Sequence, residues 1–86
     1  MFELVFRRAF EKSFKKLETP PQKQIQNKIL ELKQNSILGK KLGHYPYWSI
    51  HIGKYRIIYQ IHSKDNKIEL IEILQRKHDY KELKKL

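Results

Sequence analysis

The sequence predicts a single α+β domain over residues 1–86: an N-terminal strand, a helix hairpin, a three-stranded antiparallel meander completing a four-stranded sheet, and a short C-terminal helix. Three observations predict it. Apolar residues change near residue 6 from every second position to every third or fourth, prolines interrupt the helical stretch at 20 and 21, and alternation returns from residue 47. In such domains the helices pack on one sheet face, so the other face is expected to be partly open.

The strand and the helix hairpin follow from this spacing. Alternation over residues 2–6 predicts a short strand, after which an apolar stripe marks the first helix at Phe6, Phe10, Phe14 and Leu17. Thr19 is expected to cap the second helix, and the prolines that follow are compatible with its first turn. This helix is expected to end near residues 35–36. Residues 37–46 are predicted to form a loop, and residues 78–86 a short basic helix.

Composition favours a polyanionic partner. The chain has 19 Lys or Arg against 9 Asp or Glu, a net charge of +10, which indicates nucleic acid ahead of an acidic protein. A heat-adapted surface is the alternative, but such surfaces usually balance their charges. The chain has no cysteine, no apolar run of membrane length and no secretory signal, so we expect a cytoplasmic protein without a membrane partner. Its four histidines lack ligand spacing, so no metal or cofactor is expected, and His44 and His62 are interpreted as surface residues.

A two-residue turn sets the register of the meander. Gly53-Lys54 lies between two β-rich runs, roughly 47–52 and 55–61, and suits a type II′ turn that places His51 opposite Arg56. Alternation then assigns one group to the core beneath the helices: Trp48, Ile50, Ile52, Tyr55, Ile57, Tyr59 and Ile61. The other face receives Tyr47, Ser49, His51, Arg56, Ile58 and Gln60. The last strand, roughly 67–75, is apolar on both parities, as expected for a strand flanked on both sides.

The polar groups on and after these strands suit RNA chemistry. Cleavage through a ribose 2′-hydroxyl needs a base, a cation that stabilises the transition state, and an acid for the departing 5′-oxygen. Histidine titrates near neutrality, so His51 or His78 can move the proton. Arg56 and Arg76 can bind phosphate oxygens in bidentate fashion.

Aromatic and basic residues complete the candidate site. Tyr80 or Tyr47 can stack on an unpaired base or hydrogen-bond the phosphate. Collective phosphate contacts are expected from Lys40, Lys41, Lys54, Lys77 and Lys81. Simpler interpretations remain: Arg56 can pair with Glu72, His51 can be an exposed strand histidine, and Tyr80 can anchor the C-terminal segment.

These motifs resemble the RelE/ParE superfamily of bacterial and archaeal toxins, and the RelE branch more closely. The resemblance rests on the Gly53-Lys54-Tyr55-Arg56 hairpin and on Arg76-x-x-x-Tyr80. It implies a ribosome-dependent, metal-independent endoribonuclease that cuts mRNA in the ribosomal A site, and a RelB-like antitoxin as partner beside the ribosome and mRNA.

In the family, catalysis uses residues that match Arg56, Arg76 and Tyr80, together with lysines or arginines on the strand before the hairpin. Here that strand offers Ser49 and His51, which leaves the identity of the base open. Two alternatives have other functions: a ParE-like toxin that inhibits gyrase without cleaving nucleic acid, and a small RNA- or ribosome-binding domain without activity. Retention of the arginines and the tyrosine favours the nuclease.

Overall fold

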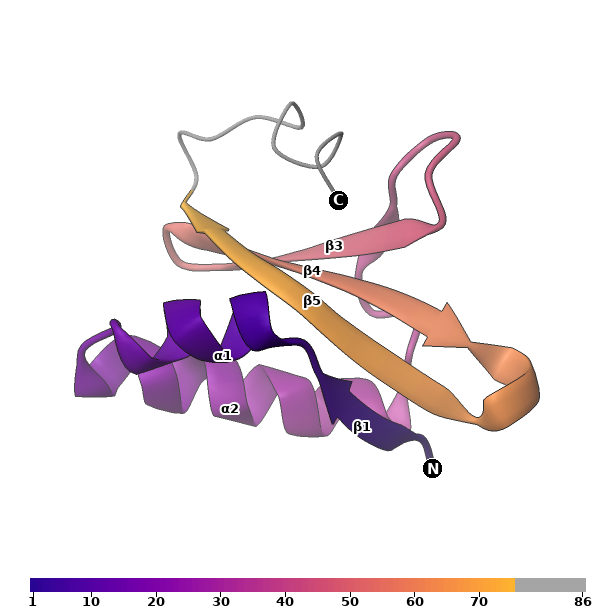
Figure 1. Ribbon diagram of the computed structural model, residues 1–86, viewed down its shortest axis with the longest axis horizontal. Helices are drawn as coiled ribbons and strands as arrows, with labels where there is room; N and C mark the ends of the chain where they lie inside the picture. Colours follow the sequence, from indigo (N-terminus) through magenta and orange to yellow (C-terminus); the bar gives the residue numbers. More distant parts are fainter. Residues whose placement is uncertain (76–86) are drawn as a thin grey trace.

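The computed structural model describes residues 1–75 as two helices on one side of a five-stranded sheet with strand order β1-β5-β4-β3-β2 (Figure 1). The strands are β1 (Glu3–Phe6), β2 (Lys40–Lys41), β3 (Tyr47–Ile52), β4 (Tyr55–His62) and β5 (Lys67–Gln75), and the helices are α1 (Arg8–Lys15), α2 (Thr19–Gln34) and a 3-10 turn, Ser63–Asp65. The α+β class is confirmed, but the prediction of four strands is wrong. The fifth strand, β2, lies within the predicted 37–46 loop. The predicted C-terminal helix lies outside the described residues.

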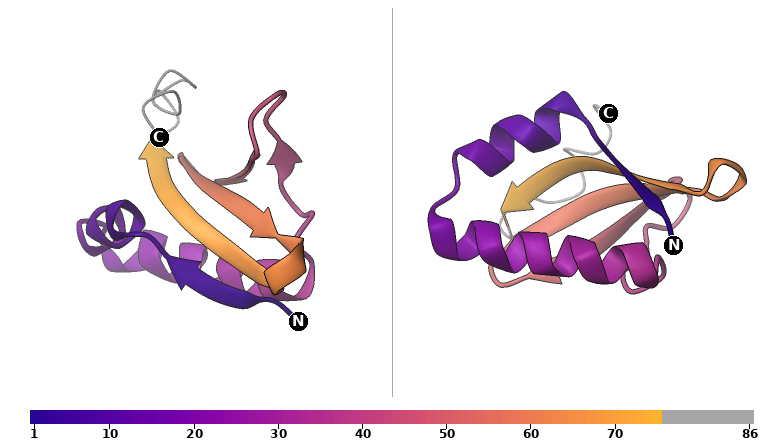
Figure 2. Two further views of the ribbon diagram at one scale, coloured as in Figure 1. Left: turned by 45° about the vertical axis from the view of Figure 1, so that its right-hand side comes forward. Right: turned by 90° about the horizontal axis from the view of Figure 1, so that it is seen from below.

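The two main helices run in opposite directions beneath the sheet (Figure 2). α1 begins two residues later than the apolar stripe suggested, because Arg7 is extended and donates its N–H to the carbonyl of Leu70. Thr19 is not the cap of α2: Glu18 occupies that position and Thr19 is the first helical residue, with the prolines in the first turn. In the part of the chain described, neither helix is long and apolar enough to cross a membrane.

The sheet has an apolar cluster on each face. The main core under the helices contains the predicted strand residues together with Phe10, Ile25, Ile29, Leu32, Ile68, Leu70 and Ile73. The open face carries a smaller cluster of Leu42, Ile58, Ile71 and Leu74, with Tyr45 and Tyr47 packed against it. The face is therefore only partly open, since Leu42 and Tyr45 of the segment between β2 and β3 pack against it.

A β-bulge in β5 lets this strand serve both clusters. Ile58 pairs with Glu72 and Tyr59 with Leu70, so Ile71 is the extra residue. Even-numbered residues, Ile68 and Leu70, face the main core before the bulge. After the bulge the odd-numbered Ile73 faces it. The strand is also flanked on both sides, by antiparallel β4 and, for its first half, by parallel β1. The bulge and the two flanking strands together explain why both odd- and even-numbered residues of β5 are apolar.

A polar network joins the β1–α1 junction to the sheet. Arg7 Nε donates to Glu69 Oε2 at 2.5 Å, and His62 Nε2 lies 2.9 Å from Glu69 Oε1. Burial alone would raise the pKa of Glu69, but the hydrogen bonds from Arg7 and His62 outweigh it and lower that pKa below its usual value. His62, which was interpreted as a surface residue, has a side chain that is 36% exposed and is also a partner in this network.

We expect Glu69→Gln to lower the free energy of unfolding by about 1 kcal/mol at neutral pH, a modest value because the Arg7 side chain is 41% exposed. A carboxyl whose folded pKa is depressed stabilises the fold above its unfolded pKa and loses that effect as pH falls through the folded value. The difference from wild type should therefore shrink below pH about 4 in urea unfolding.

Glu31→Gln is the matched control, since it removes an exposed pair with Lys28 and should change stability by less than about 0.5 kcal/mol. A Glu69→Gln deficit that is the same in acid and at neutral pH would show that the network stabilises nothing through charge.

Candidate functional site

The hairpin between β3 and β4 brings His51 and Arg56 together as predicted. They pair directly across the strands, and Arg56 Nη2 lies 3.1 Å from His51 Nε2. Gly53 has φ +58°, and Asn66 is the one non-glycine residue in 1–75 with a positive φ, so Lys54 is negative, as a type II′ turn requires. The turn thus fixes the pair by fixing the register.

The chemistry of the two side chains sets the direction of this bond. A guanidinium has only N–H donors, so Arg56 donates and His51 Nε2 accepts. This contact therefore requires the His51 tautomer that carries its proton on Nδ1. The Nε2 lone pair of the exposed His51 becomes available to a proton when the Arg56 guanidinium turns to another acceptor.

The residues around this pair form two rows across the open face. One row runs His51, Arg56, Leu74, and the next runs Lys40, Ser49, Ile58. Ser49 is only 5% exposed, so its side chain is not available to a ligand. Lys40 is exposed and belongs to the row beside the pair.

Two predicted phosphate contacts are not brought into these rows. Lys41 pairs with Trp48, a residue of the core face, so it belongs to the opposite side of the sheet from Lys40. The Lys54 ammonium lies 5.7 Å from the centre of the Tyr55 ring, which packs beneath the helices. Arg76, Lys77, Tyr80 and Lys81 lie outside the described residues; Gln75, the residue before them, pairs with Tyr55.

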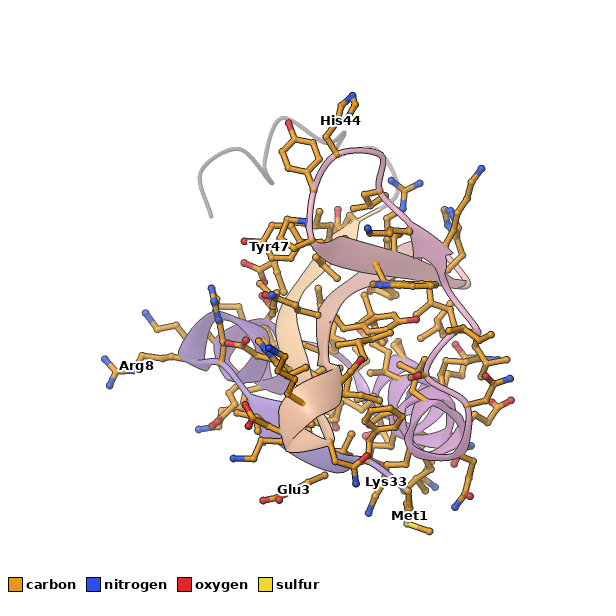
Figure 3. All side chains as sticks on the ribbon, turned by 90° about the vertical axis from the view of Figure 1, so that its right-hand side faces the viewer. Met1, Glu3, Arg8, Lys33, His44 and Tyr47 are labelled. Carbon is orange, nitrogen blue, oxygen red and sulfur yellow. The ribbon has the colours of Figure 1, made fainter. Side chains whose placement is uncertain are left out.

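Sequence reasoning missed two sets of contacts around the site. Glu72 accepts hydrogen bonds from Ser13 Oγ at 2.7 Å and from the Ile73 N–H, and thus ties β5 to α1. The Tyr59 hydroxyl bonds to the backbone of residues 36 and 39. His44, which was interpreted as a surface residue, is exposed at the outer tip of the loop after β2 and projects away from the sheet (Figure 3). Alternation predicted only which face each strand residue takes, not these longer contacts.

Comparisons with known proteins identify the family. A family model described as the ParE toxin of the type II toxin–antitoxin system parDE matches residues 4–80. The chain belongs to the RelE/ParE toxin superfamily. Comparison with curated protein sequences gives no significant match.

Solved structures agree with this toxin fold. The isolated E. coli RelE toxin has a TM-score of 0.81 at 21% identity, over 99% of this chain and 97% of that one. RelE in the intact E. coli RelBE toxin–antitoxin complex gives 0.80 at 20%, over 91% and 100%. The RelB–RelE antitoxin–toxin complex of Methanococcus jannaschii gives 0.69 at 26%, over 85% and 91%. The two E. coli matches are too distant in sequence to establish more than the fold.

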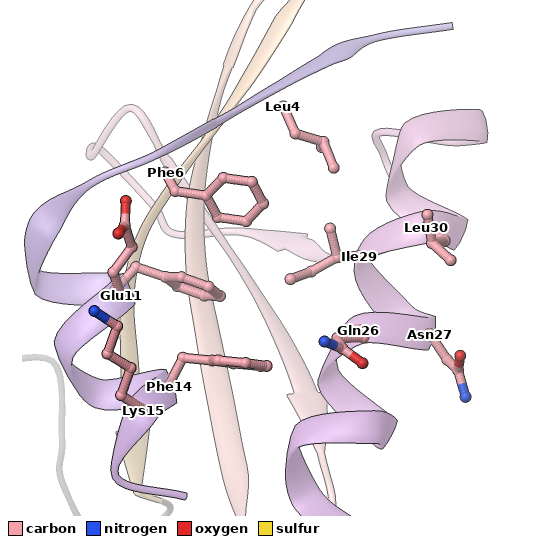
Figure 4. Close-up of a pocket in the computed structure, with 10 residues that line it drawn as sticks. Leu4, Phe6, Glu11, Phe14, Lys15, Gln26, Asn27, Ile29 and Leu30 are labelled. Atoms are coloured by element: carbon pink, nitrogen blue, oxygen red, sulfur yellow. The ribbon is translucent and has the colours of Figure 1, made fainter.

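The toxin has a second surface feature, an apolar groove between β1, α1 and α2 with a volume of about 530 Å³. Its lining is Leu4, Phe6, Phe10, Phe14, Ile29 and Leu30, with Glu11, Lys15, Gln26 and Asn27 at the rim (Figure 4). Phe6 is 42% exposed and Leu30 58% exposed. The groove lies on the helix side of the sheet, away from His51 and Arg56.

In residues 1–75 no group of three His, Cys, Asp or Glu side chains is placed to hold a metal ion.

Proposed function

We propose that this toxin is a ribosome-dependent, metal-independent endoribonuclease that cleaves mRNA in the ribosomal A site and so inhibits translation. The observation that carries the proposal is the His51–Arg56 pair on the open face, with the cation of Lys40 in the neighbouring row. A positioned neutral imidazole next to a guanidinium provides both a proton acceptor and a phosphate ligand.

In the proposed reaction, the scissile phosphate binds the Arg56 guanidinium and draws it from His51. The Nε2 lone pair of His51 then takes the proton of the 2′-hydroxyl. The 2′-oxygen attacks phosphorus, the bond from phosphorus to the 5′-oxygen breaks, and the departing oxygen takes a proton from His78, the second histidine proposed for proton transfer. The products are a 2′,3′-cyclic phosphate and a 5′-hydroxyl, so no metal-activated water is required. Arg76 is proposed as the second phosphate ligand, and Tyr80 as a group that stacks on the base or hydrogen-bonds the phosphate.

The second candidate is a gyrase inhibitor without nuclease activity, as expected for the ParE branch. It is favoured by the family model, whose description is that of the ParE toxin. The two functions make different demands on the open face, because inhibition by binding requires no proton acceptor beside a phosphate ligand.

A translation extract distinguishes the two. We expect the wild-type protein to produce mRNA cuts at codon boundaries, detected by primer extension, and Arg76→Ala to lose them. Message that remains intact, together with stabilised gyrase–DNA cleavage complexes, would replace the nuclease by the gyrase inhibitor. Intact message without gyrase complexes would leave only the inactive RNA- or ribosome-binding domain.

We also propose a RelB-like antitoxin as partner, encoded by the neighbouring gene as a short acidic helical protein. The proposed docking surface is the apolar groove. Its exposed Phe6 and Leu30 suit the apolar face of a helix, and the net charge of +10 suits acidic flanks. This surface lies apart from the His51–Arg56 face, so binding and catalysis can be separated by mutation.

Leu30→Glu should weaken binding to the protein encoded by the neighbouring gene by about 10- to 100-fold, since a buried leucine contributes about 1.5–3 kcal/mol. Isothermal titration calorimetry measures the change, and mRNA cleavage should be retained. The matched control is Ile37→Glu: Ile37 is 65% exposed and lies outside the groove lining, so the control introduces the same charge without the loss. If both variants weakened binding equally, the added negative charge would be responsible and the groove would not be the docking surface.

A further inference from the structure

A buried tyrosine fixes the segment that leads into β2. Tyr59 is fully buried in the main core, and its hydroxyl donates to the carbonyl of Ser36 at 2.8 Å while accepting the N–H of Gly39 at 3.0 Å. Burial raises the pKa of Tyr59 despite the opposing effect of the Gly39 N–H, so the hydroxyl keeps its proton for Ser36. One side chain of β4 therefore holds both ends of residues 36–39.

Close packing of Gly39 further restrains this segment. We call the Tyr59 hydrogen bonds to Ser36 and Gly39, together with this packing, the Tyr59 clamp. A Cβ at this position would lie 2.6 Å from the Ser49 carbonyl oxygen and 2.6 Å from the Tyr59 hydroxyl oxygen. Only glycine fits between β3 and the tyrosine. Gly39, the residue before β2, is thus packed directly against β3, the strand that pairs with β2.

The close packing of Gly39 against β3 affects the register of β2, because β2 is only two residues long. Lys40 pairs with Ser49 and Lys41 with Trp48, so the lysines belong to opposite faces of the sheet. Two pairs specify register weakly, and a slip of one residue would exchange the two faces. Trp48, the partner of Lys41, stacks on Tyr59 with ring centroids 6.3 Å apart. The same tyrosine therefore contacts both the segment before β2 and the strand residue that pairs with Lys41.

We propose that Lys40 is the phosphate-binding lysine of the His51–Arg56 face and that Tyr59 is its positioning residue. This rests on the proposed function to the extent that RNA is the ligand. On the strand before the hairpin, this row of residues offers only the buried Ser49, which carries no charge. The register of β2 places a lysine directly opposite that serine, on the same face, so Lys40 supplies the charge from the adjacent strand.

The test is the salt dependence of binding to a short fluorescein-labelled single-stranded RNA, measured by anisotropy without ribosomes. Each lost phosphate contact should reduce the slope of log K against log salt by about 0.7. Lys40→Ala should show this reduction, Lys40→Arg should retain the wild-type slope, and Lys41→Ala, which removes the same charge from the other face, should leave it unchanged. Equal slopes for the two alanine variants would overturn the assignment of Lys40.

Tyr59→Phe tests the positioning role because it removes only the hydroxyl. The variant should remain folded by circular dichroism yet show the reduced slope of Lys40→Ala, and the double variant should show no further reduction. A wild-type slope in folded Tyr59→Phe would overturn the role of the tyrosine.

If wild-type protein binds no RNA, the inference falls together with RNA as ligand. If it binds RNA with the Lys40 dependence but cuts no message in the translation extract, the nuclease fails and the phosphate contact stands.

Discussion

Arg56→Ala is expected to reduce mRNA cleavage in a translation extract by about 10²- to 10³-fold, the effect of removing one preorganised donor from a transition state. The guanidinium is held at 3.1 Å from His51 by a fixed hairpin register, so its loss removes a phosphate ligand and the neighbour that orients the base. Cleavage rates by primer extension measure the effect. Arg56→Lys should recover only part of the rate, because an ammonium cannot bind phosphate in bidentate fashion.

Arg8→Ala is the matched control for charge. Arg8 begins α1 and projects into solvent away from the sheet (Figure 3). The substitution removes one positive charge and should leave cleavage within a few-fold of wild type. If both arginine variants lose activity equally, net charge and not the His51–Arg56 face is responsible.

Gly39→Ala should have the largest effect on stability, about 3 kcal/mol in urea unfolding, since the added carbon displaces the backbone and breaks both hydrogen bonds of the Tyr59 hydroxyl. The carbon would lie 2.6 Å from a backbone oxygen of β3, which cannot rotate away as a flexible side chain does. The segment 36–39 must therefore move.

Gly43→Ala separates this steric cause from backbone strain. Gly43 has φ +46°, but a Cβ there meets no atom within 4 Å. Its substitution should cost roughly 1 kcal/mol, the penalty of the left-handed conformation alone. A Gly39→Ala cost no greater than that of Gly43→Ala would mean that the loop relaxes freely and that the clamp is weak.

The parts of the fold that depend on local spacing were predictable. The turn at Gly53 and strict alternation on both sides fixed the register, and with it the contact between His51 and Arg56. The two helices followed from the change of period and the prolines. The start of α1 shifted because Arg7 bonds to Leu70, a contact between segments far apart in the sequence that no local pattern reports.

The parts that depend on pairing between distant segments were not predictable. A strand as short as β2 has no periodicity, so only its pairing with β3 separates Lys40 from Lys41. The bulge at Ile71 changes which face a residue takes without any change of residue type. Arg7 and Glu69 are 62 positions apart, and their ion pair is invisible to a search for nearby charges. Arg76 and Tyr80 remain predictions from the family resemblance.

The parallel pairing of β1 with β5 has a consequence for biosynthesis. Glu3, the first residue of the sheet, pairs with Lys67, so the strand that is synthesised first pairs with the last strand of residues 1–75. Contacts of such high sequence separation form late, after the local hairpins. During its own translation the nascent chain therefore lacks a finished sheet, and β4 lacks its neighbour on that side until β5 has been synthesised. A protein proposed to attack translating ribosomes would in this way remain incomplete on the ribosome that makes it.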